Sequence, residues 1–523
     1  MKARGRNLHY LGGYSCRQAR YDLHNVGCCS AFAKANRAQN WVCSDTDLSM
    51  ACALDRFVTT TEKAARRCRI LDDELVKIGE EWSLNNCSAN SVRGPGAAAV
   101  AGVPGFRFAT IPDGLPPSDD DVTQDVSSLC KSTEETCLVP FRCLLAELND
   151  PATGHPPVTC VISDALVDFS MEAAKELGLP YVQLWTSSAV SFVGYCQYRL
   201  LFDRGLAPIK DVKELTDEYL DTPVEDVQGL RNMRFRDFPT FIRSPAPYDF
   251  MLHFALRITE RAVGASAMIV NTFGELEGEA VAAMEELGMP KVYTIGPLPL
   301  LAPSSTISMS LWKQQEECLP WLDDKEPGSV VYVNFGSITV MTNEQLVELA
   351  KGLAKSGRHF LWIIRPDLVK GDTAVLPPEF SAETAERGLV ASWCPQQQVL
   401  NHPAMGAFLT HSGWNSTLES MCSGMPVISW PFFADQQTNC RYQCNEWGVG
   451  MEIDNNVQSD AIADLIMELM EGDKGLLMKK KTQEWREKAV KATKPGGSSH
   501  RNFQELIANV VLAPRRSIIP PQS

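Results

Sequence analysis

The residues with the clearest chemical potential lie at one turn between a strand and a helix. The apolar run 406–410 predicts a strand, His411 to Asn415 form a turn of small and polar residues, and 416–421 has a helical pattern. A helix N-terminus after such a turn presents unpaired backbone N–H groups and a partial positive charge, which suit a diphosphate without a metal ion. Asn415 and Ser416 add side-chain donors, and His411 adds an imidazole N–H. The turn therefore predicts a phosphate-binding site.

Nearby residues supply the other contacts that a nucleotide sugar needs. Trp393 ends a predicted strand and offers an indole face on which a flat base could stack. Glu419 lies one helical turn beyond Asn415 and can accept from a ribose diol, while Asp435 and Gln436 can bind sugar hydroxyls. Any one of them alone would more often be a core aromatic, a helix cap or a solvated carboxylate. Their joint spacing therefore carries the prediction.

The stretch from Trp393 to Gln436 resembles the signature box of plant UDP-dependent glycosyltransferases of secondary metabolism, and every diagnostic position matches. The resemblance implies uracil contacts from Trp393 and the backbone of Cys394, ribose contacts from Gln396 and Glu419, diphosphate contacts from His411, Asn415 and Ser416, and sugar contacts from Trp414, Asp435 and Gln436. In this family a glutamine at the last box position usually accompanies glucose, and a histidine galactose. UDP-glucose is therefore the implied donor.

Two alternations of strands and helices must position these residues. Strand-like runs at 106–111, 158–163, 181–185, 267–271 and 292–295 precede a Ser/Thr-rich linker, and runs at 330–337, 359–364, 389–393, 406–410 and 426–430 follow it. Such alternation predicts an α/β fold with largely parallel sheets. We therefore predict two Rossmann-like domains facing a cleft, the GT-B arrangement of the family, with a first domain that lacks its usual first strand and helix.

The predicted domain organisation has five parts. Residues 1–95 are an atypical N-terminal segment, 96–298 an incomplete acceptor-binding domain, 299–329 a linker, 330–490 a UDP-sugar-binding domain, and 491–515 a C-terminal helix that packs back on the first domain. Within the N-terminal segment only residues 60–82 have a clear pattern, that of an amphipathic helix. This helix could bind a partner or pack on its own domain.

Four residues outside the signature box match other positions of the family. The predicted strand at 330–337 ends in Gly336, which lets a backbone approach closely, and Ser337, which can donate to a phosphate across from His411. The resemblance implies that Thr186 contacts the 6-hydroxyl of the sugar. It also implies that Asp164, at the end of another predicted strand, orients the catalytic histidine. An aspartate in that place is also often only a helix cap.

The general base itself is not found in the sequence. The family carries it in a Gly-His-x-x-Pro turn after its first strand, and residues 1–95 contain no such turn or strand. His155 lies in Gly-His-Pro-Pro, but that run precedes the strand leading to Asp164 and would lie at the wrong end for the cleft. His9 and His24 lack an apolar strand that would direct either of them toward the cleft.

The leading functional prediction is transfer of glucose from UDP-glucose to a hydroxyl of a small hydrophobic acceptor of flavonoid, terpenoid or cyanohydrin type. The family's mechanism implies inversion to a β-glucoside, with no metal or other cofactor. The alternative is a UDP-sugar-binding protein that has lost transfer, or a gene product with a misassigned N-terminal exon. A nucleotide-sugar epimerase of the same architecture is disfavoured because the signature box is specific to transferases. The sequence does not indicate the acceptor or the oligomeric state.

Composition sets the outer bounds. The chain has 523 residues, 44% of them apolar, which favours two globular domains, and its net charge of −15 argues against nucleic-acid or anionic-membrane partners. There is no apolar run of about 18 residues and no signal-peptide core, so we predict a cytoplasmic protein without a transmembrane segment. The 17 cysteines form no C-x-x-C pair, which favours reduced thiols.

Overall fold

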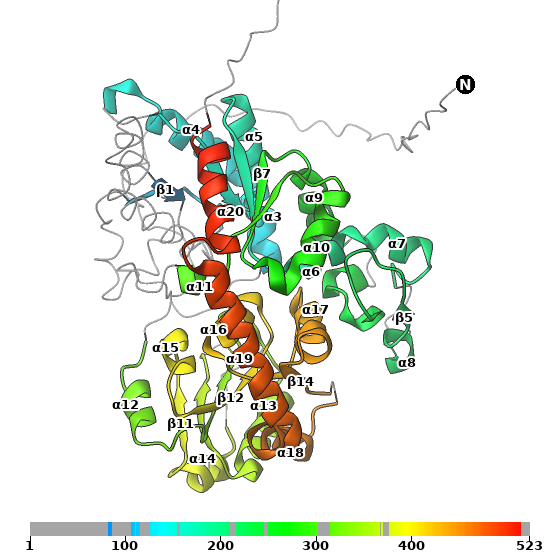
Figure 1. Cartoon of the computed structure of the whole chain (residues 1–523), viewed down its shortest axis with the longest axis vertical. Coiled ribbons are helices and arrows are strands. Elements are labelled where there is room, and N and C mark those ends of the chain that lie inside the picture. Colours follow the sequence, from blue (N-terminus) through cyan, green and yellow to red (C-terminus); the bar gives the residue numbers. More distant parts are fainter. Residues whose placement is uncertain are drawn as a thin grey trace, which may run out of the picture. The chain divides into compact units, whose positions relative to one another are not determined.

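The computed structural model describes residues 82–85, 106–109, 111–115, 126–153, 157–209, 216–244, 249–301, 314–366, 368–369, 376–454 and 456–513 (Figure 1). His9, His24 and His155 lie outside these residues. So does most of the predicted helix at 60–82, whose last residue, Trp82, instead begins strand β1 (Trp82–Asn85). The predicted end of that helix at Trp82 is therefore wrong.

The first large sheet is formed by four parallel strands in the order β3-β4-β7-β8. They are β3 (Val161–Asp164), β4 (Tyr181–Trp185), β7 (Ala267–Val270) and β8 (Val292–Thr294). Every residue of β4 and β7 is buried, because helices cover both faces of a parallel sheet. All four strands overlap the runs predicted from the sequence.

One edge of this sheet belongs to β3. Among the described strands β3 pairs only with β4. Strand β2 (Phe106–Ala109), which is the first of the predicted runs, pairs in parallel with β1 in a separate two-stranded sheet. Asp164, the last residue of β3, therefore lies at the margin of the four-stranded sheet.

The second sheet has six parallel strands in the order β11-β10-β9-β12-β13-β14. Their bounds are β9 (Val330–Asn334), β10 (His359–Ile363), β11 (Gly388–Ala391), β12 (Met405–Thr410), β13 (Val427–Ser429) and β14 (Gly450–Glu452). The strand order reverses between β9 and β12, and open α/β sheets bind ligands beyond the carboxyl ends of the strands at such a switch point. The loops after β9 and β12 are thus the expected place for a ligand.

Helices connect these strands. In the first part they are α3 (Val126–Thr136), α4 (Leu138–Leu148), α5 (Phe169–Glu176), α6 (Ala189–Cys196), α7 (Tyr198–Asp203), α8 (Asp217–Leu220), α9 (Phe250–Ala262), α10 (Gly274–Glu286) and α11 (Leu298–Leu301). In the second part they are α12 (Cys318–Asp323), α13 (Asn343–Ser356), α14 (Pro378–Thr384), α15 (Gln396–Leu400), α16 (Trp414–Ser423), α17 (Gln436–Arg441), α18 (Ser459–Glu471) and α19 (Asp473–Thr493). Short pieces are β5 (Pro223–Val224), β6 (Met233–Arg234), η3 (Pro151–Thr153), η4 (Ala165–Val167), η6 (Phe235–Asp237), η7 (Thr240–Arg243) and η8 (Tyr442–Glu446).

The C-terminal helix α20 (Ser498–Leu506), continued by η9 (Ile507–Val511), returns to the first sheet (Figure 1). Asn502 on α20 donates through Nδ2 to the carbonyl oxygen of Thr294 at 3.0 Å and to its hydroxyl at 2.9 Å. Ser499 donates to the carbonyl oxygen of Gly296 at 2.5 Å. Helix α20 is therefore hydrogen-bonded to β8 and to Gly296, which follows it.

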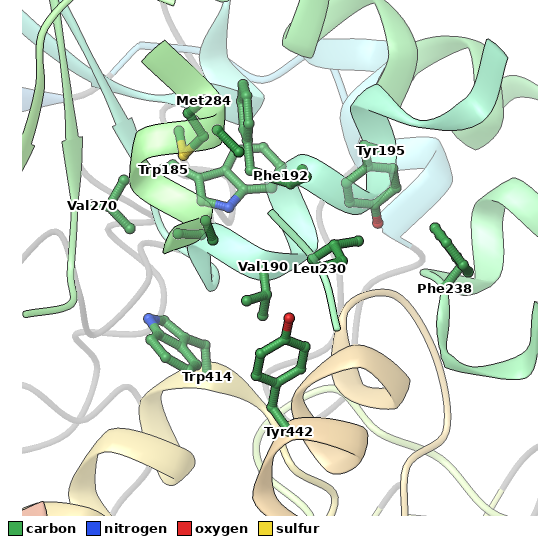
Figure 2. Packing of buried hydrophobic residues seen from close by; sticks show 14 of the residues in the cluster. Trp185, Val190, Phe192, Tyr195, Leu230, Phe238, Val270, Met284, Trp414 and Tyr442 are labelled. Carbon is green, nitrogen blue, oxygen red and sulfur yellow. The ribbon is translucent and has the colours of Figure 1, made fainter. Parts of the chain in front are cut away.

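A continuous apolar cluster joins the two sheets' helices. Figure 2 shows Tyr442, from η8, directed toward Val190 and Leu230 of the first part, and Trp414, from α16, in the same cluster. The indole N–H of Trp414 donates to the carbonyl oxygen of Asn271, directly after β7, at 2.9 Å. Because burying a large apolar side chain contributes roughly 1.5–3 kcal/mol, this cluster holds the carboxyl ends of the two sheets together.

Candidate functional site

The turn after β12 leads directly into the N-terminus of α16. The helix begins at Trp414, two residues earlier than the predicted helical run, so the backbone N–H groups of Trp414, Asn415 and Ser416 form its first turn. The residue before it, Gly413, has no side chain to cap them. A Cβ atom at Gly413 would lie 2.4 Å from Nε2 of His411, so only glycine fits beside that ring. This arrangement leaves the N-terminus of α16 open to an anion.

His411 lies under this turn and is buried. Burial lowers its pKa to about 4, and the nearby positive charge of Arg365 adds to the effect. The imidazole is therefore neutral at physiological pH and carries one ring N–H, and a hydrogen bond between the ring and the backbone of Asn334 offsets part of the pKa shift.

The loop after β9 packs directly on the His411 ring. Gly336 has a φ of +70°, and a Cβ atom there would lie 2.8 Å from the imidazole. The buried guanidinium of Arg365 donates to the carbonyl oxygen of Gly336 at 2.9 Å and also to that of Thr339. The structure thus brings the predicted Gly336-Ser337 loop and the His411 turn together. Arg365 was missed from the sequence, although a charged residue directly after an apolar strand was a usable signal.

Gln396 connects most of the remaining polar groups. Its side-chain oxygen accepts from Asn334 at 2.7 Å and from the Tyr332 hydroxyl at 3.1 Å. Its amide nitrogen donates to Glu419 at 2.6 Å and to Ser416 at 3.1 Å. One amide therefore ties the end of β9 to two residues of α16. Each group that it joins is fixed before any ligand arrives.

Trp393 and Cys394 lie two and three residues beyond the end of β11 at Ala391, so the predicted strand 389–393 ends too late. The Trp393 side chain is half-buried, and its carbonyl oxygen accepts from the backbone of Gln315 at 2.9 Å. The Cys394 thiol is buried 3.2 Å from the Tyr332 hydroxyl. The Cys394 side chain thus belongs to the core, and its backbone is the part that can face a ligand.

Asp435 and Gln436 lie at the start of α17. The Gln436 side-chain oxygen accepts from the backbone N–H groups of Phe432 and Phe433 at 2.8 and 3.2 Å. The half-buried Asp435 carboxylate accepts from the hydroxyl of Ser187, in the loop after β4. Burial raises the pKa of Asp435, and hydrogen bonds from Ser187 and Asn439 partly offset this effect. The predicted sugar residue Thr186 directly precedes Ser187 in the sequence.

Trp414 was also predicted to contact a sugar. Its side chain is buried, and its indole N–H is occupied by Asn271. A ligand contact from Trp414 would therefore come from its backbone N–H at the first turn of α16.

Asp164 ends β3 and is half-buried. Its Oδ1 atom accepts from the backbone N–H of Leu166 at 2.9 Å, so it caps the short helix η4. The helix-cap interpretation is thus part of its role. The histidine that Asp164 would orient stays unidentified, because His9, His24 and His155 lie outside the described residues.

Two features are absent from the described ranges. No group of three or more histidine, cysteine, aspartate or glutamate side chains within them is arranged to hold a metal ion. No helix within the same ranges is both long enough and apolar enough to cross a bilayer.

Comparison with known proteins identifies the family. Residues 297–481 match the family described as UDP-glucoronosyl and UDP-glucosyl transferase. The 7-deoxyloganetin glucosyltransferase of Gardenia jasminoides is 56% identical over 79% of this chain and 87% of its own length. The (R)-mandelonitrile beta-glucosyltransferase of Prunus dulcis is 52% identical over 80% of this chain and 88% of its own length.

A solved structure agrees with these relatives. The structure of Phytolacca americana UGT2 complexed with UDP-2fluoro-glucose and pterostilbene has a TM-score of 0.64 at 30% identity, covering 78% of this chain and 88% of that chain. The resemblance and the fold class predicted from the sequence are thereby confirmed. The chain belongs to the UDP-glucoronosyl and UDP-glucosyl transferase family, has the GT-B fold, and is an enzyme of the glycosyltransferase class.

Proposed function

We propose that this chain transfers glucose from UDP-glucose to a hydroxyl of a small hydrophobic acceptor and inverts the anomeric carbon to give a β-glucoside. The Gln396 network is the observation that carries the proposal. It joins Glu419 and Ser416 to the switch point between β9 and β12, next to Trp393. Stacking, diol-accepting and phosphate-binding groups therefore occur together in the order that a nucleotide sugar requires.

The names of the relatives support the acceptor class. They give 7-deoxyloganetin and (R)-mandelonitrile, the latter a cyanohydrin, as the molecules glucosylated, and one name specifies a β-product. We infer that this chain takes an acceptor of terpenoid or cyanohydrin type. Flavonoids and a cytoplasmic location stay predictions of the sequence. Neither the relatives nor the described residues favour the alternative of a binding protein without transfer activity.

The proposed reaction is a single in-line displacement. The acceptor oxygen forms a bond to the anomeric carbon, its proton passes to a base, and UDP leaves with the electron pair of the broken C–O bond. Negative charge then grows on the diphosphate, which the N-terminus of α16 and the neutral His411 N–H would stabilise. The buried Arg365 guanidinium adds positive potential behind the same loop.

The two halves of the site have different tasks in this proposal. Residues 330–490 bind the donor, with Gly336 and Ser337 on the diphosphate and Asp435 and Gln436 on the sugar. Residues 96–298 bind the acceptor, and Thr186 reaches the sugar from that side. Asp164 would orient the general base and stabilise its charged form as the proton is taken up.

Calorimetry with UDP and UDP-glucose tests the donor assignment. Trp393→Ala should weaken UDP binding by roughly 1–3 kcal/mol, the scale of losing one base–aromatic stack. Trp321→Ala is the matched control, because Trp321 is a half-buried indole that packs on the same core cluster from α12. An intact chain that binds no UDP, or equal losses in the two variants, would sink the assignment. The product's anomeric configuration, read by NMR coupling constants, tests inversion.

A further inference from the structure

Asn439, on α17, is fully buried and uses its whole side-chain amide. Its nitrogen donates to the carbonyl oxygen of Ser412 at 2.9 Å and to Oδ2 of Asp435 at 2.7 Å. Its oxygen accepts from the hydroxyl of Ser188 at 2.6 Å. All three partners come from different loops.

These partners belong to three separate parts of the site. Ser412 precedes Gly413 in the turn before α16 and has a φ of +63°, a conformation that few residues with a side chain adopt. Ser188 is the N-cap of α6 in the first part of the chain. Asp435 is the predicted sugar carboxylate. The Asn439 amide therefore connects the turn before α16, the Asp435 carboxylate at the start of α17, and the N-terminus of α6 in the first part of the chain.

The contacts also determine which Asp435 oxygen is available. Both side-chain donors, Ser187 and Asn439, reach Oδ2, and the backbone N–H of Asp435 also bonds the carboxylate. Oδ1 is then the oxygen that can accept from a ligand. Because Asn439 is itself held by Ser188 and Ser412, the carboxylate plane of Asp435 is fixed relative to the turn that precedes α16.

We propose that Asn439 is a positioning residue that aims Oδ1 of Asp435 at a hydroxyl of the donor sugar and keeps that carboxylate in register with the diphosphate turn. This inference rests on the proposed function. It predicts that Asn439 contributes to recognition of the sugar more than to recognition of UDP. A residue needed only for folding would affect both alike.

The surroundings of Asp435 allow a test by protonation. The titratable groups facing it from the packed elements are Glu277 on α10 and the Tyr195 phenol on α6; burial raises the pKa of both, and the Asp435 charge adds to the effect. In Asn439→Asp a second carboxylate would lie within hydrogen-bond distance of the first. Two carboxylates so close cannot both ionise cheaply, and a single shared proton would restore the lost hydrogen bond.

The experiment compares binding of UDP with binding of UDP-glucose by calorimetry, together with kcat and KM. In Asn439→Ala we expect the affinity ratio of UDP-glucose to UDP to fall about tenfold, with little change for UDP alone. Asn439→Asp should keep most of the ratio at pH 5.5 and lose it as the pH is raised far enough to remove the shared proton, with the wild type at each pH as reference. Asn439→Ala should not recover the ratio at pH 5.5.

Gln443→Ala supplies the control for losing a buried amide. Gln443 lies on η8, is fully buried and bonds Ser429 and Thr417 outside the Asp435 contacts. An Asn439→Ala ratio like that of Gln443→Ala, or an Asn439→Asp variant without recovery at low pH, overturns the inference while wild-type UDP binding upholds the proposed function. Wild-type protein that binds no UDP overturns both.

Discussion

The carboxyl edges of the two sheets differ in how many contacts hold their predicted site residues. In the proposed function the edge of the six-stranded sheet binds the donor, and the edge of the four-stranded sheet binds the acceptor. At the six-stranded sheet, Gln396 bonds to four residues of two elements, and Gly336 packs on the His411 ring. At the four-stranded sheet, Asp164 ends the edge strand β3 and caps η4. The proposed donor edge is thus organised by residues 393–436 together with the end of β9 and the loop after it. At the proposed acceptor edge, the short helix that Asp164 caps begins directly after it in the sequence.

The largest expected effect concerns the acceptor edge. We expect this chain to transfer glucose at least ~100-fold more slowly than a version carrying the family's first strand and Gly-His-x-x-Pro turn in front of Gly96, because general-base catalysis typically contributes about 10²- to 10⁴-fold. An aspartate alone is a poor base for an alcohol, since its reference pKa of about 3.9 is far below that of the hydroxyl. Product formation from radiolabelled UDP-glucose measures the difference.

Asp164→Ala sharpens the same comparison. The substitution should cost little in the present chain and much in the version with the added histidine, where Asp164 has a ring to orient. Equal rates for the two unsubstituted versions would show that a histidine such as His9 or His24 already acts as the base. Both edges would then contain the residues that the reaction needs, and they would differ only in which segments of the chain supply them.

At the donor edge, Gln396→Leu should weaken UDP binding by about 2–3 kcal/mol. The leucine leaves the side chains of Asn334 and Glu419 without their common partner, and hydrogen bonds to charged groups are the more costly ones to lose. Gln397→Leu, one residue along the same helix, serves as the control for the change in composition. Equal UDP affinities of the two variants in calorimetry would contradict the proposal that Gln396 organises the donor-binding residues.

Glu277, on α10, is expected to make the stability of the folded chain depend on pH. It is buried, and its Oε1 accepts from the backbone N–H of Val190 on α6 at 3.0 Å. Burial raises its pKa from 4.5 to about 7. Between these values the folded chain holds a proton that the unfolded chain has released, so stability falls as the pH rises through this window and the loss is complete above pH 7.

We therefore expect Glu277→Gln to be more stable than the wild type at pH 8, by about 1–2 kcal/mol, and to show no such advantage at pH 4.5. Glutamine keeps an oxygen that can accept from Val190 but has no proton to lose. Urea unfolding followed by circular dichroism at both pH values measures the effect, with the exposed Glu275→Gln on the same helix as control. A gain of the same size at both pH values would exclude titration of Glu277 as its cause.

Sequence alone predicted secondary structure better than contacts between distant segments, and the reason is physical. The strands and the α16 turn follow from local apolar runs and small residues, so β4 and the β12–α16 junction were predicted to within two residues. Arg365, Ser187 and Asn439 were not predicted, because their roles depend on contacts between segments far apart in the chain. Trp414 shows the same limit, since its pattern could not reveal that its indole N–H bonds Asn271 in the other domain.

The smallest expected effect concerns donor choice at Gln436. Its side-chain oxygen is held by the backbone of Phe432 and Phe433, so the amide nitrogen is the group that it can present to a sugar hydroxyl. Gln436→His replaces that donor by a ring nitrogen in a different direction, which should shift preference from UDP-glucose toward UDP-galactose by roughly 1 kcal/mol, the value of one hydrogen bond. Competition between the two donors in one reaction measures the ratio directly. Because Gln436 is proposed to contact the sugar and not UDP, the affinity for UDP should stay constant while the sugar preference changes. An unchanged ratio would mean that donor choice is set from the other edge, for which Thr186 is the first residue to replace.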